Sequence, residues 1–240
     1  MIEKYQIAKS MAKAMILSQR LRMNKNGGEV TMEQDNYKKV CEYWRQKALE
    51  FDYQERYAAL GLPGYNENNL PITYFGVDYQ INRSDASIIR VDQPAAALDF
   101  CTQSAIYHLF HFSKEAPRNS GNFIPLHELR GAAPFSPAFK KATLIPFAKT
   151  FEGKMPQLIA AAEKLGFERL ANSDAGFQAM AFVCMPIRFL FWDGDEELPA
   201  QATILFDEKI TDFTHEETVI GIGSDLVNRL FDAAGLKRLA

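Results

Sequence analysis

Cysteine is scarce in this chain, which has only three among its 240 residues, namely Cys41, Cys101 and Cys184. They lie far apart and form no C-x-x-C pair, so they indicate free thiols rather than a disulfide framework. Free thiols are typical of proteins in a reducing compartment, and we therefore expect a cytoplasmic location.

Two further absences narrow the classes of function. Basic residues are not in excess, because 27 Lys and Arg stand against 30 Asp and Glu, giving a formal net charge of −3. A nucleic-acid-binding domain usually shows a strong basic excess, so we expect no nucleic-acid partner. The chain also lacks a run of about eighteen apolar residues, so no membrane span is expected.

Aromatic and apolar residues are plentiful, with 18 Phe, 9 Tyr and an apolar fraction of 47%. This is enough material for a sizeable core, and the length suits one large domain or two small ones. We predict a basic helical N-terminal extension over residues 1–30 and a single α+β domain over residues 31–240.

The predicted extension carries six cations beside a narrow apolar stripe: Lys4, Lys9, Lys13, Arg20, Arg22 and Lys25. Such a helix either docks on a protein partner or a membrane surface, or packs its stripe on the domain. Because the stripe is thin and imperfect, packing on the domain is the favoured interpretation.

The rest of the chain alternates between helical and strand patterns. Capping-box spacing from Thr31 to Gln34 predicts a helix toward Leu60, with a kink near Phe51 as an alternative, and Gly61 as its terminator. We further expect a strand–turn–strand over 71–91, with its turn at Ser84–Asp85, followed by a helix capped by Asp92. Two more helices are predicted, one from Ser136 and one over 155–165, and then three strands near 177–183, 187–192 and 201–206. A capping box from Thr214 to Glu217 predicts the start of a final helix.

The strand "IRFLFW" (187–192) is the best guide to the fold. Alternation places Ile187, Phe189 and Phe191 on one face and Arg188, Leu190 and Trp192 on the other. Both faces are mostly apolar, which predicts cover on both sides. Short connections to its neighbours favour antiparallel pairing. We therefore predict an α+β fold with an antiparallel or mixed β-sheet packed by helices.

The stretch "FWDGDEELP" (191–199) holds four carboxylates, those of Asp193, Asp195, Glu196 and Glu197. Asp193–Gly194 is a turn signal, so the cluster is expected on a loop at one end of the sheet. Carboxylates suit hard cations, but the spacing does not match an EF-hand. Either the loop is solvated with its carboxylates capping backbone groups, which is favoured, or it binds a ligand or metal through Trp192, Asp195, Glu196 and Glu197.

Position along the hairpin excludes Asp207 from this loop. If the two strands pair antiparallel, five or six residues at about 3.3 Å each put Asp207 roughly 17–20 Å away.

Two other side chains are candidates for chemistry. His108 lies on a predicted helical face with Cys101, Ser104 and His111, which suits a nucleophile–base pair or a soft metal. A buried, hydrogen-bonded histidine is the favoured alternative. Arg188 is the single charge in its strand, and either pairs with an acid or binds an anion in a pocket. Gly221 and Gly223 fall inside the final helix, where close packing explains them better than a dinucleotide loop.

The segments "SGNFIPLHELRGAAPF" and "MPIRFLFWDGDEELPAQATILFD" resemble a family of uncharacterised proteins from anaerobic prokaryotes, described only as a domain of unknown function. The resemblance runs from Tyr37 to Leu230 and is most specific in the pattern W-x-G-D-E-E-x-P. It implies that Asp195, Glu196 and Glu197 are signature positions, and it implies no activity. Some members carry a four-cysteine iron–sulfur segment like that of corrinoid proteins, which this chain lacks. His127 also stands where an arginine is expected.

These observations favour a small-molecule or cofactor-binding protein with its site at the 192–199 loop and with His108 and Arg188 as further candidates. One alternative is a metal-assisted hydrolase with Asp195 and Glu196 as cation ligands and Glu197 or His108 as general base. The other is a non-catalytic partner in an anaerobic metabolic complex that docks through the N-terminal helix. The sequence assigns no cofactor and no particular metal.

Overall fold

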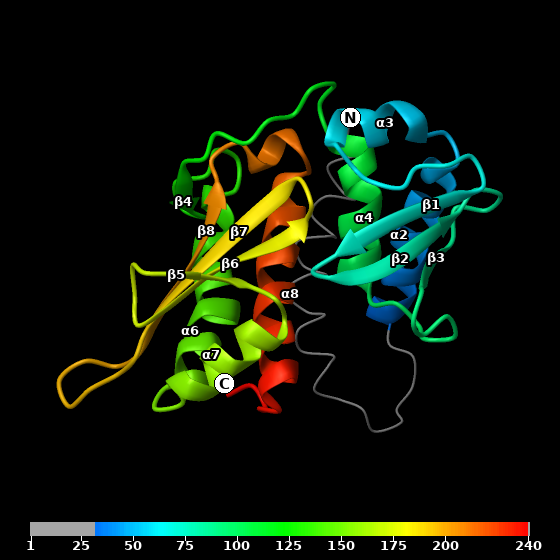
Figure 1. Cartoon of the computed structure of the whole chain (residues 1–240). Coiled ribbons are helices and arrows are strands. Elements are labelled where there is room, and N and C mark those ends of the chain that lie inside the picture. The colour runs from blue at the N-terminus through cyan, green and yellow to red at the C-terminus, as the bar shows by residue number, and fades with distance from the viewer. Residues whose placement is uncertain (1–31, 240) are drawn as a thin grey trace. The chain divides into compact units, whose positions relative to one another are not determined.

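The computed structural model describes residues 32–239 and has an α+β fold with two antiparallel sheets, which confirms the predicted fold class (Figure 1). The basic segment 1–30 and Thr31 lie outside the described residues. The chain divides into two compact units: unit 1 comprises residues 32–117 and 212–221, and unit 2 comprises residues 118–211 and 222–239. A single domain over 31–240 stays a prediction. Within the described residues, no helix is long and apolar enough to cross a bilayer.

Unit 1 combines helices with a three-stranded sheet of order β1-β2-β3. Helix α2 packs against α4, and α4 contacts β1. Trp44 of α2 is buried in the cluster that also contains Ala86 and Tyr107. The elements are α2 (Met32–Ala48), α3 (Tyr53–Leu60), β1 (Asn69–Tyr74), β2 (Val77–Asn82), β3 (Ile88–Arg90) and α4 (Phe100–Phe112).

The uninterrupted helix predicted toward Leu60 is wrong, and the chain breaks where the alternative placed a kink, near Phe51, because α2 ends at Ala48 and α3 begins at Tyr53. The Asp52 carboxylate accepts a hydrogen bond from the Glu55 N–H at 3.0 Å and so caps a separate helix, α3. Gly61 ends α3 as predicted, with φ of +63°.

The region predicted as strand–turn–strand contains three strands. Phe75 and Gly76 both have positive φ, +47° and +72°, and reverse the chain between β1 and β2. The predicted turn at Ser84–Asp85 is confirmed between β2 and β3.

The helix after β3 starts later than Asp92. Asp99 caps it instead, because its Oδ1 accepts the Thr102 N–H at 3.0 Å. Asp92 pairs with Arg90, whose Nε lies 2.6 Å from its Oδ1.

Unit 2 is built around a five-stranded sheet of order β4-β8-β7-β6-β5. The three strands predicted near 177–183, 187–192 and 201–206 are confirmed, and the sheet also has two edge strands of three residues each that were not predicted. The turn η2 is π-helical, and the last helix, α8, begins in unit 1. The elements are β4 (Phe123–Pro125), η1 (Ala133–Phe135), α5 (Ser136–Phe139), η2 (Lys140–Leu144), α6 (Ile145–Phe151), α7 (Met155–Lys164), β5 (Glu168–Leu170), β6 (Ala175–Phe182), β7 (Met185–Trp192), β8 (Gln201–Asp207), η3 (Ile210–Asp212) and α8 (Glu216–Ala234).

Helices cover one face of this sheet (Figure 1). The Phe147 ring of α6 lies 5.6 Å from the Phe189 ring of β7 and 6.4 Å from the Phe231 ring of α8. On the other face of β7, Leu190 is buried, but Arg188 is half-buried and Trp192 is 39% exposed. The prediction that both faces of β7 are covered is therefore only partly correct, because Arg188 and Trp192 leave a polar and aromatic rim on the second face.

The final helix does not start with the predicted capping box. In place of a Thr214 hydroxyl cap, the Glu217 N–H donates to the His215 Nδ1 at 3.3 Å. Helix α8 then contains Gly221 and Gly223, as predicted.

We expect the Gly223→Ala substitution to lower the free energy of unfolding by about 1–3 kcal/mol through overpacking. A Cβ at Gly223 would lie 2.9 Å from Phe139 Cζ and 3.0 Å from Phe206 Cζ. Helix propensity alone would favour alanine by about 1 kcal/mol, so the expected sign is opposite to that of an exposed site. Urea-induced unfolding followed by circular dichroism measures the change. The exposed Ala160→Gly on α7 calibrates the propensity, and an unchanged or raised stability of Gly223→Ala would contradict the close packing.

Candidate functional site

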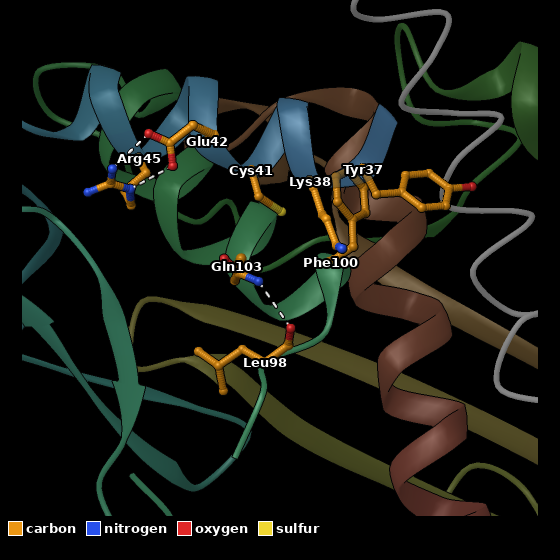
Figure 2. A pocket seen from close by; sticks show the side chains of 8 residues that line it. All are labelled: Tyr37, Lys38, Cys41, Glu42, Arg45, Leu98, Phe100 and Gln103. Carbon is orange, nitrogen blue, oxygen red and sulfur yellow. Dashed lines mark hydrogen bonds and ion pairs between the residues drawn. The ribbon is translucent and has the colours of Figure 1, made fainter. Parts of the chain in front are cut away.

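Unit 1 contains a cavity of about 300 Å³ between α2 and the segment that leads into α4 (Figure 2). Its lining combines aromatic and aliphatic side chains with a thiol, an amide and three charged groups. The lining residues are Tyr37, Lys38, Cys41, Glu42, Arg45, Leu98, Phe100 and Gln103.

Helix α2 supplies one wall because its lining residues recur every three or four positions. Lys38, Cys41 and Arg45 therefore share one face of the helix. At about 1.5 Å of rise per residue, Lys38 and Arg45 are roughly 10 Å apart along the helix axis. Figure 2 shows the Glu42–Arg45 pair at one end of the cavity and Tyr37 at the other, with Cys41 between them.

The opposite wall is held in place by the start of α4. Gln103 Nε2 donates to the Leu98 carbonyl at 3.0 Å, which ties the first turn of the helix to the residue before its cap. Phe100 is buried, and its ring lies 5.2 Å from that of Tyr37 at a tilt of 41°. The apolar part of the cavity is therefore formed by rings from both walls.

The described lining residues include two cations, of which one is paired with a described acid. Arg45 makes a bidentate contact with Glu42, with Nε to Oε2 at 2.8 Å and Nη2 to Oε1 at 2.7 Å. These hydrogen bonds from Arg45, followed by one from Gln46, lower the pKa of Glu42 to about 2, so its carboxylate stays ionised. Lys38 makes no ion pair with any side chain that the structure describes, and it is exposed.

The thiol in the cavity is a poor nucleophile. Burial, followed by the nearby Asp99 carboxylate, raises the pKa of Cys41 to about 12. Only the thiolate attacks an electrophile, and at neutral pH this side chain stays protonated. The lining also contains no histidine. The cavity is therefore suited to binding rather than to acid–base or covalent chemistry.

The acidic loop 193–198 of unit 2 uses its aspartates to cap its own backbone. Asp193 Oδ1 accepts the Gly153 N–H at 2.8 Å and the Gly194 N–H at 2.9 Å. Asp195 Oδ1 accepts the N–H groups of Glu197 and Leu198, both at 2.8 Å. The hydrogen bond from Leu198, followed by that from Glu197, lowers the pKa of Asp195.

The remaining acids of this loop, Glu196 and Glu197, are exposed. Among the described residues, the acids of this loop do not belong to any group of three potential metal ligands whose ligand atoms lie within 4.8 Å of one another. The geometry therefore matches a solvated, backbone-capping loop. Ligand binding by Trp192, Asp195, Glu196 or Glu197 stays a prediction.

The glycine of this loop has a steric reason. A Cβ at Gly194 would lie 2.6 Å from Glu152 Oε1 and 2.9 Å from the Ala200 nitrogen. Glu152 Oε1 accepts the Ala200 N–H at 2.9 Å, so the loop is held against the turn after α6. The glycine of "WDGDEELP" is thus explained by the loop's own structure.

The register of β7 and β8 confirms that Asp207 is remote from the acidic loop. Trp192 pairs with Gln201 beside the loop, whereas Ile187 pairs with Phe206 at the opposite end of the hairpin. Asp207 is buried there and accepts hydrogen bonds from Ser120 and Gly121. Sequence reasoning located this residue correctly but gave it no role.

Arg188 contacts an amide and a ring. Its Nε donates to Gln178 Oε1 at 2.9 Å, and its guanidinium lies 3.7 Å from the centre of the Phe123 ring. The first of the two predictions for Arg188, a pair with an acid, is wrong among the described residues, where its contacts are a hydrogen bond and a cation–π interaction. Anion binding by Arg188 stays a prediction.

His108 belongs to unit 1 and is 0% exposed. Its Nδ1 lies 2.6 Å from Thr218 Oγ1, and its ring lies 4.5 Å from that of Trp44 in an edge-on arrangement. Burial, followed by the charges of His215 and His111, holds its pKa well below the ordinary value. It is therefore the buried, hydrogen-bonded histidine that was favoured, and it does not line the cavity.

Sequence reasoning missed all eight residues of the cavity lining. The periodic spacing of Lys38, Cys41 and Arg45 was a usable signal for one polar face of α2. The other wall could not be found, because it depends on α4 starting at Phe100 rather than near Asp92.

Comparison with known proteins gives one family and no individual relative. No curated protein and no solved structure matches the chain. A family model described as "Domain of unknown function (DUF3786)" matches residues 52–229. The match includes the acidic loop, His108, Arg188 and the α4 wall of the cavity, whereas α2 precedes it. The chain therefore belongs to the DUF3786 family, whose description states no function.

Proposed function

We propose that this protein binds a small molecule and that the cavity between α2 and the start of α4 is the binding site. The observation that carries this proposal is a hollow of about 300 Å³ lined by rings and a few fixed polar groups. Ligand sites in proteins are concave, mostly apolar, and oriented by a small number of polar side chains, and their volumes begin at about 300 Å³.

Binding without catalysis fits the chemistry of the lining. A general base needs a pKa near the working pH, whereas Glu42 has a pKa of about 2 and is occupied by Arg45. The Cys41 thiol stays protonated. The class predicted from the sequence, a small-molecule or cofactor-binding protein, is therefore retained with a different site.

The other predictions from the sequence have less support. A metal-assisted hydrolase would need converging carboxylates, and Asp193 and Asp195 instead accept backbone N–H groups. A protein partner bound through residues 1–30 stays a prediction, because that segment lies outside the described residues. A cytoplasmic location likewise still depends on the three widely spaced cysteines.

The test is a ligand-observed NMR screen of the full chain against a fragment library containing anions, cations and neutral molecules. We expect fragments that bind the wild type to lose about tenfold or more in affinity in Cys41→Phe, because a ring at this position fills the cavity. The matched control is the double substitution Glu196→Gln and Glu197→Gln in the acidic loop, which should leave these affinities unchanged. If fragments bind Cys41→Phe with unchanged affinity but no longer bind the loop variant, the site lies at the loop and the proposal is contradicted.

A further inference from the structure

We infer that the ligand of this cavity is an aromatic monocarboxylate that carries a hydrogen-bond donor on its ring. This inference rests on the proposed function and names the ligand class for the same site. It follows from the charge balance of the lining, the rings of its apolar walls and the orientation of one amide.

The charge balance of the lining favours an anion. Lys38 and Arg45 are cations and Glu42 is an anion, so the formal sum is +1. Arg45 is satisfied by both Glu42 oxygens, and its Nη1 donates to the Asp85 carbonyl. Among the described lining residues, Lys38 is thus the cation that remains for a ligand, and one ammonium group matches one carboxylate.

The nearby Asp99 carboxylate offsets the formal +1 of the lining, but both of its oxygens are engaged at the start of α4. Its Oδ1 accepts the Thr102 N–H at 3.0 Å and its Oδ2 accepts the Thr102 hydroxyl at 2.9 Å. Asp99 does not line the cavity. A ligand cation would therefore have to compete with the cap of α4 for this carboxylate.

The apolar walls favour a flat body over a bulky aliphatic one. The Tyr37 and Phe100 rings are 5.2 Å apart and tilted by 41°, and Leu98 adds aliphatic surface. An aromatic ring gains from edge-to-face or offset contacts with both rings, which a saturated ring of similar size does not make. A planar body is also compatible with a volume of about 300 Å³.

The amide of Gln103 adds a directional requirement. Its Nε2 donates to the Leu98 carbonyl at 3.0 Å, which fixes which end of the amide is the acceptor. Oε1 is then available to accept a hydrogen bond. A hydroxyl or N–H on the ligand ring would satisfy it, whereas an unsubstituted ring would leave the acceptor unpaired.

The experiment measures affinities by isothermal titration calorimetry on the full chain with three probes of similar size. They are 4-hydroxyphenylacetate, tyramine, which reverses the charge, and cyclohexylacetate, which replaces the flat ring. We expect 4-hydroxyphenylacetate to bind about tenfold tighter than either of the other two. Lys38→Gln should weaken its binding about fivefold or more, and the exposed neighbour Lys39→Gln is the matched control that should not.

Failure of the ligand class can be distinguished from failure of the proposed function. If tyramine or cyclohexylacetate binds as well as 4-hydroxyphenylacetate and Cys41→Phe abolishes that binding, the inference is overturned while the cavity remains the site. If Cys41→Phe changes the binding of none of the three probes and of no library fragment, both the ligand class and the proposed function are overturned. Lys38→Glu gives a second reading that supports the inference if it makes tyramine the tighter ligand and overturns it if the order is unchanged.

Discussion

Asp207→Ala is expected to lower the free energy of unfolding by about 2–4 kcal/mol, because it removes a buried carboxylate that several backbone donors share. Asp207 is 1% exposed. Its oxygens accept the N–H groups of Gly121 at 2.7 Å, Ser120 at 3.0 Å and Lys209 at 2.9 Å. The side chain thus joins the end of β8 to the loop before β4.

Urea-induced unfolding at constant pH measures this loss, with an unchanged dependence on denaturant as the sign of an intact two-state transition. Asp207→Asn keeps the shape and one acceptor oxygen, so it should fall between the wild type and Asp207→Ala. The neighbouring exposed Lys209→Ala, which keeps the backbone N–H of that residue, is the control and should change stability by no more than about 0.5 kcal/mol. If Asp207→Ala also lowers the free energy of unfolding by no more than about 0.5 kcal/mol, the carboxylate is not needed to hold the loop.

A second large effect is expected on acidification, where the free energy of unfolding should fall by about 1–2 kcal/mol between pH 6.5 and pH 5 because of His108. Burial holds the pKa of His108 well below its ordinary value in the folded chain. In the unfolded chain it returns to about 6.5, so the unfolded state binds more protons in this window. The stability that depends on neutral His108 is therefore complete above about pH 6.5 and is lost as the pH falls below it, at no more than about 1.4 kcal/mol per pH unit.

The measurement is the free energy of unfolding as a function of pH for wild type and His108→Gln. The glutamine keeps a polar partner for Thr218 but cannot be protonated, so its pH dependence should be shallower. His127 is exposed, and His127→Gln is the matched control for the loss of an imidazole at another position. An identical slope in His108→Gln would show that the pH dependence does not come from His108 and would contradict this explanation.

The fold was predictable where the side-chain pattern is decisive. Strands β6, β7 and β8 are long and apolar, and only residues 183–184 and 193–200 connect them, so their existence and antiparallel pairing follow from the sequence. The edge strand β4 has only three residues, and it exists because Phe123 pairs with Asp207. No local sequence pattern predicts this long-range pairing. The turn at Phe75 was missed for a similar reason, since a phenylalanine with positive φ is held there by the packing of the unit and not by its own preference.

The site was less predictable than the fold. Four clustered carboxylates are conspicuous in a sequence, but the sequence does not show where their oxygens point, and Asp193 and Asp195 point at backbone N–H groups. The cavity has the opposite character. Its walls come from residues 37–45 and 98–103, which are separated by an entire sheet in the chain, and each segment alone has an ordinary composition.

The central claim is that the cavity between α2 and the start of α4 is where this protein binds its ligand. The most direct measurement is a map of backbone amide chemical-shift changes in the full chain on titration with the tightest-binding fragment. The structure predicts that the largest changes fall within residues 37–45 and 98–103. Changes concentrated in residues 192–199, with these two segments unaffected, would contradict it.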